Sequence, residues 1–176
     1  MKWILMAMLP IGWLTTSTIV DFSDDQQNWY VLNDGVMGGL SKGTLTFEDG
    51  LMIFEGKVSL ENNGGFASIR NPWNELDLSD AKKIKIRYRS TGQNFAMTLE
   101  REKQWYQPNF KVDIPISEEW RELTIKPSDF KAHQVGRKLD YTMTKDEMKN
   151  VIRMGFITND KAATNFKLEI DYIQID

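Results

Sequence analysis

Apolar and polar residues alternate along most of this 176-residue chain. In Lys83–Arg89, for example, Ile84, Ile86 and Tyr88 share one face of an extended segment, while the cations between them are expected to face solvent. A half-buried antiparallel strand has this period of two. The same alternation recurs, with turns or Pro between the runs, in 44–47, 51–54, 95–99, 110–114, 123–125 and 166–170. Strands at this spacing predict a β-sandwich or barrel.

Two local signals refine this prediction. Asp49-Gly50 lies between two alternating runs, and this dipeptide is a strong signal of a tight hairpin. Thr144 followed by Glu147 fits a capping box, which predicts one short helix near 144–150. A chain of this length can bury a sizeable core as one unit. We therefore expect a single all-β domain over 19–176.

Two segments rich in Gly, Asn and Asp, residues 33–41 and 61–70, stand about one hairpin apart. These residue types adopt positive φ at low cost, and an ordinary turn needs only two of them. The segments either form a joined loop surface that offers N–H groups and amides to a partner or sugar, or make turns and a bulge that close one edge of the sandwich. The candidate binding residues in them are Asn33, Asp34, Gly38, Gly39, Asn62, Asn63, Gly64 and Gly65.

Three larger side chains complete the candidate site. Arg70 follows the second Gly-rich segment and either presents a guanidinium fork to a ligand carboxylate or forms an internal pair with Glu61 or Asp34. Trp105 and Tyr106 lie in a polar, loop-like context, where two large aromatic residues are poorly explained as core. Such rings stack on sugars or anchor a protein interface, and the alternative is that one of them caps the core.

Composition argues against several classes of binding and catalysis. The net charge of -3 gives no general attraction to nucleic acid. The chain has no Cys and a single His, His133, so thiolate catalysis and a His-rich zinc site lack their parts. The adjacent carboxylate pairs at 24–25, 118–119 and 146–147 do not suggest the facing dyad of a glycosidase.

No spacing typical of metal or nucleotide binding is present in the sequence. We therefore expect no catalytic residues, no cofactor, no metal and no nucleic-acid partner. A structural Ca²⁺ on loop oxygens and a hydrolase with unrecognised carboxylates are weaker alternatives.

Residues 1–18 have the order of a secretory signal peptide. Met1-Lys2 precede an apolar run from Trp3 to Leu14, and small polar residues follow it. This run of about a dozen residues is shorter than the roughly 20 that a spanning helix needs. We expect export or a position on the periplasmic side. The alternatives are an uncleaved or peripheral membrane segment, and a buried part of the fold in a cytoplasmic protein.

Several motifs are informative through their order along the chain. They are Trp29, Asn33–Gly39 with Ser41, Phe54-Glu55-Gly56, Leu60–Ser68, Trp120, Phe130, Gly136-Arg137, Gly155-Phe156 and Phe166–Ile173. Their order resembles the complex I intermediate-associated protein family of the thirty-kilodalton class, over nearly all of the chain after about Ile19. Two turns, Ser90–Gln93 and Thr164-Asn165, depart from the family pattern.

The resemblance implies a jelly-roll sandwich similar to galactose-binding domains, with the first and last strands close together. The best-known eukaryotic members of the family assist assembly of respiratory complex I, and the resemblance names no catalytic residues. We therefore predict a non-catalytic domain that binds a protein partner or acts as an assembly factor for a membrane or envelope complex. The alternative is a carbohydrate-binding module of an exported protein, in which the Gly-rich loops, Trp105 and Tyr106 contact glycan.

Overall fold

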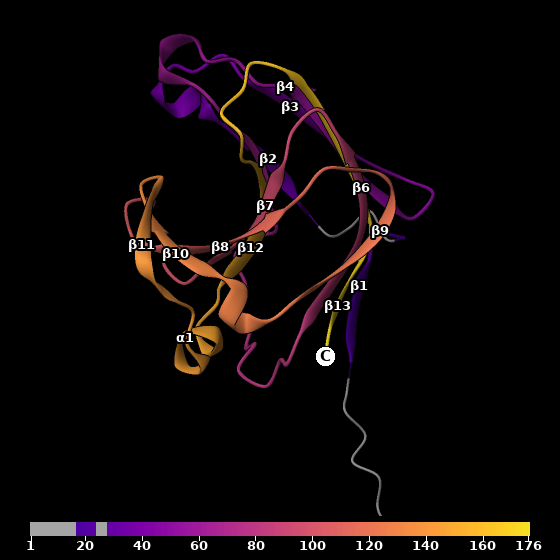
Figure 1. Ribbon diagram of the computed structural model, residues 1–176, viewed down its shortest axis with the longest axis vertical. Coiled ribbons are helices and arrows are strands. Elements are labelled where there is room, and N and C mark those ends of the chain that lie inside the picture. Colours follow the sequence, from indigo (N-terminus) through magenta and orange to yellow (C-terminus); the bar gives the residue numbers. More distant parts are fainter. Residues whose placement is uncertain (1–16, 24–27) are drawn as a thin grey trace, which may run out of the picture.

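The computed structural model describes residues 17–23 and 28–176, which form two antiparallel sheets packed face to face (Figure 1). The predicted all-β sandwich is confirmed. Inward side chains of the two sheets meet in one core, where Phe54 of one sheet lies 6.5 Å from Phe95 of the other between ring centroids. Phe54 also packs on Phe166 at 4.8 Å, and Trp29 stacks on Phe156 at 6.0 Å. Alternation in the sequence thus becomes a shared apolar layer.

One sheet has six strands arranged around its longest strand, β13. The order is β3 (Lys42–Glu48), β4 (Leu51–Lys57), β13 (Asn165–Ile175), β6 (Ile84–Thr91) and β9 (Ser117–Ile125), with β1 (Thr18–Asp21) also paired to β13. β4 and β1 pair with successive parts of β13. The first and last strands are therefore neighbours, as the family resemblance implied. β1 begins at Thr18, the last residue of the predicted N-terminal segment.

The other sheet has seven strands. Their order is β11 (Arg137–Thr142), β10 (Lys131–Gln134), β8 (Asn109–Ile114), β7 (Phe95–Glu100), β12 (Arg153–Thr158), β5 (Ala67–Arg70) and β2 (Tyr30–Asn33). β7 and β12 lie in the middle and are buried along their whole length. Their outward side chains are therefore covered as well as the inward ones, which is unusual for the solvent side of an antiparallel sheet.

Short helices and tight turns connect these strands. The 3-10 helices are η2 (Asp34–Met37), η3 (Glu61–Asn63) and η4 (Pro127–Asp129), and the single α-helix named among the described residues is α1 (Lys145–Lys149). The predicted capping box is confirmed, because Thr144 N donates to the Glu147 carboxylate at 2.8 Å and Thr144 Oγ1 accepts from Glu147 N at 3.3 Å. The predicted hairpin is also present, with φ of 52° at Asp49 and 77° at Gly50.

The cations of β6 and the residue before it lie on the outward side of the sheet, as expected, but they are also paired. Each has an acidic partner on a neighbouring segment: the pairs are Lys83–Asp176, Lys85–Glu122, Arg87–Asp171 and Arg89–Glu169. Sequence alternation placed them outward, but it could not identify these partners because three of the four lie more than 75 residues away. The result is a ladder of ion pairs across the outside of the six-stranded sheet.

Most of the predicted N-terminal segment lies outside the described residues. Within residues 17–23 and 28–176, no helix is both long enough and apolar enough to cross a membrane.

The two turns that depart from the family pattern meet in the structure. Gly92 follows β6 with φ of +85°, and a Cβ placed on it would lie 2.0 Å from the backbone oxygen of Asn165, where β13 begins. The close approach of the two backbones requires glycine at this position.

We expect Gly92→Ala to destabilise the fold more than Gly50→Ala does. Gly50 also has positive φ, but nothing lies within 4 Å of its Cβ position, so alanine there costs only the left-handed conformation, about 1–2 kcal/mol. At Gly92 the methyl group must also displace the start of β13. Urea unfolding of both variants measures the difference, and equal losses would contradict the role of this contact.

Candidate functional site

The carboxylate of Asp34 joins the two Gly-rich segments. It accepts hydrogen bonds from Gly65 N at 2.7 Å and Phe66 N at 3.2 Å, and from Ser41 N at 3.1 Å and Ser41 Oγ at 2.5 Å. Ser41 Oγ in turn accepts a bond from Ser59 N at 3.0 Å. Burial acts to raise the pKa of Asp34, but these hydrogen bonds outweigh it and hold the pKa below its ordinary value. The two segments therefore form one unit around a buried anion.

The four glycines of this unit serve it in two ways. Gly38 and Gly65 adopt positive φ, of 85° and 143°. Gly39 and Gly64 do not, but a Cβ on either would lie only 2.3 Å and 2.7 Å from a carboxylate oxygen of Asp34. Close packing around the carboxylate therefore explains the glycine content at least as well as turn geometry does.

The asparagines of the Gly-rich segments are placed differently from one another. Asn33 Oδ1 is buried with no hydrogen-bond partner among the described residues. Asn62 and Asn63 are exposed and both have positive φ, 54° and 60°. Among these predicted binding residues, Asp34 is 4% exposed and is held by the fold, whereas Asn62 and Asn63 face solvent. A role of the loops in recognition stays a prediction.

The outward side of the seven-stranded sheet, called the outer face below, brings together residues that are distant in sequence. Strand register places one row across it: Tyr30, Arg70, Gly155, Thr98, Lys111 and Lys131 lie opposite one another from β2 to β10. A second row contains Arg153, Glu100, Asn109 and His133. Opposite residues in a sheet share a face, so these side chains form one polar surface.

Glu100 is the centre of a charged cluster on the outer face. Its carboxylate forms ion pairs with Arg70 and with Arg153, whose Nε donates at 3.1 Å. Arg153 Nη1 also donates to the hydroxyl of Tyr30 at 2.7 Å, and its guanidinium lies 3.5 Å from the ring centroid of Trp73. Both Glu100 and Arg153 are 8% exposed. One carboxylate thus serves two guanidinium groups away from bulk water.

Gly155 allows Arg70 to reach Glu100. A Cβ on Gly155 would lie 3.1 Å from Arg70 Cγ and 2.5 Å from the backbone oxygen of Ile69. Because this position carries no side chain, the Arg70 side chain crosses β12 to the carboxylate on β7.

Burial lowers the pKa of Arg70 to about 10, with a further contribution from the charge of Arg153. Burial also lowers the pKa of Arg153, and the Tyr30 hydroxyl opposes that change. A guanidinium with a pKa near 10 is still protonated at neutral pH. The cluster therefore keeps two cations against a single carboxylate.

The internal pair predicted for Arg70 exists, but the predicted partners were wrong. Asp34 is occupied by backbone N–H groups and by Ser41, and Arg70 pairs with Glu100 instead of Glu61. The register of β5 and β12 decides this choice, and the sequence did not specify that register.

Trp105 and Tyr106 are exposed, as expected, with 73% and 51% of their surfaces accessible. They lie between β7 and β8, next to the end of the outer face that carries Glu100, and Gln134 Nε2 donates to the backbone oxygen of Tyr106 at 3.2 Å. Their rings are nearly perpendicular, at 84°. The Gly-rich unit lies at the opposite end, where Ala67 N donates to Thr158 Oγ1 at 3.1 Å.

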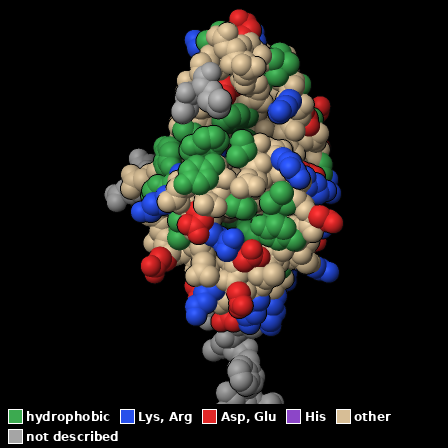
Figure 2. Space-filling view, turned by 90° about the vertical axis from the view of Figure 1, so that its left-hand side faces the viewer, with side chains coloured by type: hydrophobic (Ala, Val, Ile, Leu, Met, Phe, Trp, Pro, Cys, Tyr) green, Lys and Arg blue, Asp and Glu red, His purple; other side chains and the backbone are tan. Residues whose placement is uncertain are grey.

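The predicted site residues therefore bracket the outer face, with Arg70 between the two groups. Figure 2 views the side of the molecule that carries the β10–β11 hairpin, at the left of Figure 1. Hydrophobic side chains gather across the middle of this side, with charged side chains between and below them.

Glu100, Arg153, Trp73 and Lys111 were not among the site residues predicted from the sequence. The first two lie in the most buried strands, β7 and β12, and a charged residue within such an apolar run was the available signal. Trp73 and Lys111 carry no comparable signal. Strand pairing places Lys111 on this face, and backbone hydrogen bonds of the segment after β5 place Trp73 there.

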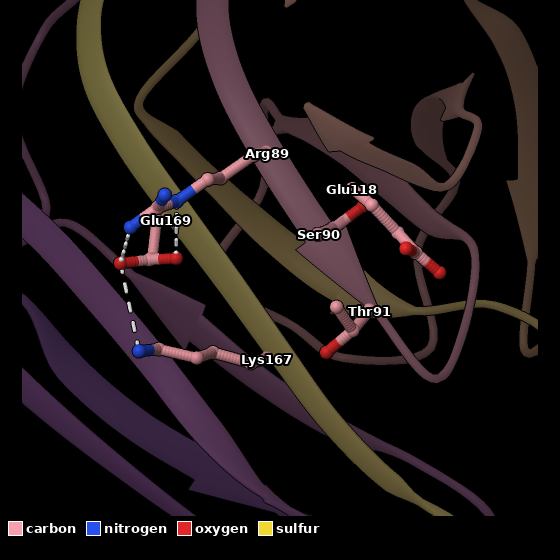
Figure 3. A pocket seen from close by; sticks show the side chains of 6 residues that line it. All are labelled: Arg89, Ser90, Thr91, Glu118, Lys167 and Glu169. Carbon is pink, nitrogen blue, oxygen red and sulfur yellow. Dashed lines mark hydrogen bonds and ion pairs between the residues drawn. The ribbon is translucent and has the colours of Figure 1, made fainter. Parts of the chain in front are cut away.

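The six-stranded sheet carries a second candidate, a hollow of about 180 Å³ (Figure 3). Glu169 accepts two hydrogen bonds there from Arg89, at 2.6 and 2.8 Å, and Lys167 Nζ lies 3.5 Å away. Arg89 also lies over the ring of Trp120, 4.9 Å from its centroid. Glu118 also lines this hollow, so two cations and two carboxylates meet there, and we assign this cluster to the structure of the sheet.

Within residues 17–23 and 28–176, no group of three or more His, Asp or Glu side chains is arranged to hold a metal ion.

Solved structures of other proteins share the β-sandwich fold of this chain. A family 11 carbohydrate-binding module of a cellulosomal cellulase from Clostridium thermocellum superposes with a TM-score of 0.68 at 14% identity, covering 91% of this chain and 94% of that one. The same kind of module in complex with a mixed-linked β-1,3-1,4 tetrasaccharide gives 0.65 at 16% identity, covering 90% and 94%. An agarase gives 0.60 at 8% identity over 92% of this chain and 25% of that one. At these identities the likeness concerns the fold alone.

Residues 20–170 match the family described as Complex I intermediate-associated protein 30. The chain belongs to this family, as the sequence motifs indicated. A search of curated proteins finds no match.

We expect Asp34→Asn to lower the free energy of unfolding at neutral pH by about 1–3 kcal/mol, because buried donors lose their anionic acceptor. The folded pKa of Asp34 is lower than its unfolded value of about 3.9. The ionised carboxylate therefore stabilises the fold fully above about pH 4, and this contribution is lost as the pH falls through the folded pKa. The gap between wild type and variant should shrink below about pH 4 in unfolding curves. Glu48→Gln, at an exposed carboxylate, is the control and should leave the pH profile unchanged.

Glu100→Gln is expected to destabilise the protein by about 3–5 kcal/mol, because it leaves two buried guanidinium groups without a counter-charge. Glu169→Gln is the matched control, since Glu169 also contacts two cations, but those side chains are 39–40% exposed. Its loss should be clearly smaller because water can solvate the freed cations. Chemical denaturation of both variants tests this, and equal losses would argue against burial as the cause.

Proposed function

We propose that this chain is a non-catalytic binding domain that holds a protein partner against its outer face, within the assembly of a membrane or envelope complex. The observation that carries the proposal is the outer face itself. A buried network of charged side chains forms its floor, and two large exposed aromatic residues border one end. Family membership supports the proposal at the level of a protein that assists other proteins.

The charged floor is held in a fixed arrangement. Arg153 is held by three neighbours at once: the Glu100 carboxylate, the Tyr30 hydroxyl and the Trp73 ring. The segment that carries Trp73 is itself fixed, because Asn71 Oδ1 accepts from Met154 N at 2.8 Å. A surface prepared before binding loses little conformational entropy when the partner docks.

Trp105 and Tyr106 match the residues that anchor protein interfaces. Large aromatic side chains dominate the energetics of such interfaces, where they are desolvated in the complex. Both are exposed in this chain, and Gln134 fixes the backbone of Tyr106. The pair therefore offers apolar area beside a polar floor.

The carboxylates of the outer face are poorly placed for hydrolysis. Glu100 already forms two ion pairs, and it is opposite Asn109, whereas Asp113 is opposite Ala96. An offset of four residues along a strand is about 13 Å, more than the roughly 5–10 Å between the carboxylates of a glycosidase. This spacing supports binding without turnover.

Glycan binding is the second candidate, and the exposed rings of Trp105 and Tyr106 favour it. The solved structures of similar fold include a module bound to a tetrasaccharide. However, the two rings are perpendicular and do not form one flat platform, and the face of Trp73 is covered by Arg153. These arrangements support the protein partner over the sugar.

The double variant Trp105→Ala/Tyr106→Ala should lose partner binding by at least about tenfold, the scale of interface anchors. Its melting temperature should barely change, because both rings are exposed. The measurement is cross-linking followed by capture of the partner from the envelope fraction. We also propose that the domain acts after export, so capture from the cytoplasmic fraction is measured in parallel and should be weaker. Ile19→Ala, which truncates a 58%-exposed residue on the other sheet, is the control.

Capture of the same partner in equal amount by the double variant would contradict the proposal. Saturable binding on a glycan array that the double variant loses would instead establish the second candidate.

A further inference from the structure

Basic side chains outnumber acidic ones on the outer face and along its β10–β11 edge. Arg70, Lys111, Lys131, Lys138 and Arg153 are set against Glu100, Asp113 and Asp140. A hollow of about 460 Å³ at this edge is lined by Lys131, Lys138 and residues 139–142. The chain as a whole has a net charge of -3, so the local surplus is contrary to the overall balance.

Lys111 is a partly buried cation of the outer face that has no ion pair among the described residues. Its ammonium group also makes no hydrogen bond to the residues that the structure describes. Burial lowers the pKa of Lys111, and the charges of Arg70 and Lys161 lower it further, while Asp113 opposes this only in part. The ammonium group therefore sits in a positive field that its neighbours do not neutralise.

Neighbouring polar atoms also lack partners. Arg70 Nε is buried with no hydrogen-bond acceptor, although Arg70 Nη1 is paired with Glu100. The six-stranded sheet differs, because each cation of its ladder has a carboxylate beside it. Figure 3 shows one of these pairs, Arg89 with Glu169. Burying a charge or a donor without a partner is unfavourable, and a ligand that supplies the missing anion removes that penalty.

We propose that the partner presents an acidic segment, and that carboxylates of this segment occupy the outer face beside Arg70 and Lys111. This inference rests on the proposed function and names the chemistry of the partner. The Lys111 ammonium group donates to the carboxylates, the charge of Arg70 adds to the positive field beside it, and Lys131 continues the same row on β10. From β5 to β10 the row spans four strand spacings, about 19 Å.

An extended polypeptide fits this row. Its alternate side chains point the same way about 7 Å apart, so several Asp or Glu residues reach the row at once. Charge complementarity of this kind also raises the association rate and sets the register of docking.

The test is a titration of the full chain with hexaglutamate at low salt, followed by calorimetry, with hexaglutamine as the neutral control. Hexaglutamate should bind, hexaglutamine should not, and added salt should weaken binding. Lys111→Met should reduce the affinity at least about tenfold while the melting temperature stays equal or rises, because an uncompensated charge is removed. Lys111→Gln should show the same loss, and Lys42→Met, which removes an exposed cation on β3, should bind as wild type does.

Three outcomes would overturn the inference: no binding of hexaglutamate, unchanged affinity in both Lys111 variants, or an equal loss in Lys42→Met. Polygalacturonate bound in a Lys111-dependent manner, with no binding of hexaglutamate, would identify an acidic glycan instead. Partner capture that requires Trp105 and Tyr106 but is unaffected by Lys111→Met would leave the proposed function standing without this inference. If the Trp105/Tyr106 variant and the Lys111 variants all capture the partner as wild type does, both the proposed function and this inference are contradicted.

Discussion

The outer face of the seven-stranded sheet depends on the carboxylate of Glu100. Two guanidinium groups are buried beside it, and each is oriented by that one anion. Through Arg153 the same contact fixes Tyr30 and Trp73, which lie on other segments. Because the charged side chains of the middle strands form ion pairs and hydrogen bonds with one another, the face has a defined shape before any ligand binds. The rest of the site, including the unneutralised Lys111, is arranged around this cluster.

Asp34 and Glu100 are buried carboxylates at opposite ends of the sheet, and each must be stabilised away from water. Each is acceptable there only because donors surround it. Asp34 accepts hydrogen bonds from backbone N–H groups and a serine, and these bonds hold the two Gly-rich segments together. Glu100 uses guanidinium groups whose total charge exceeds its own. The hydrogen bonds of Asp34 are all made within the fold. The Glu100 cluster instead keeps an excess of positive charge, which can attract an anionic group of another molecule.

Much of the fold followed from local sequence signals. Alternation predicted the strands, Asp49-Gly50 the hairpin and Thr144 with Glu147 the helix, because each of these depends on residues that are close in sequence. The site was harder for the opposite reason. Arg70 meets Glu100 only through the register of β5, β12 and β7, and the cations of β6 meet their partners only through β9 and β13. The family motifs indicated the topology but not these pairings.

The position of β13 has a consequence for how the chain is made. This strand pairs with β4, β6 and β1, so segments separated by most of the chain must be brought together around it. The six-stranded sheet cannot close until the ribosome has synthesised β13. Folding is therefore dominated by non-local contacts, which slows it relative to helical domains of similar size. Until then one edge of β4 and one edge of β6 are unpaired, and a chaperone bound to the nascent chain would protect them from pairing with other molecules.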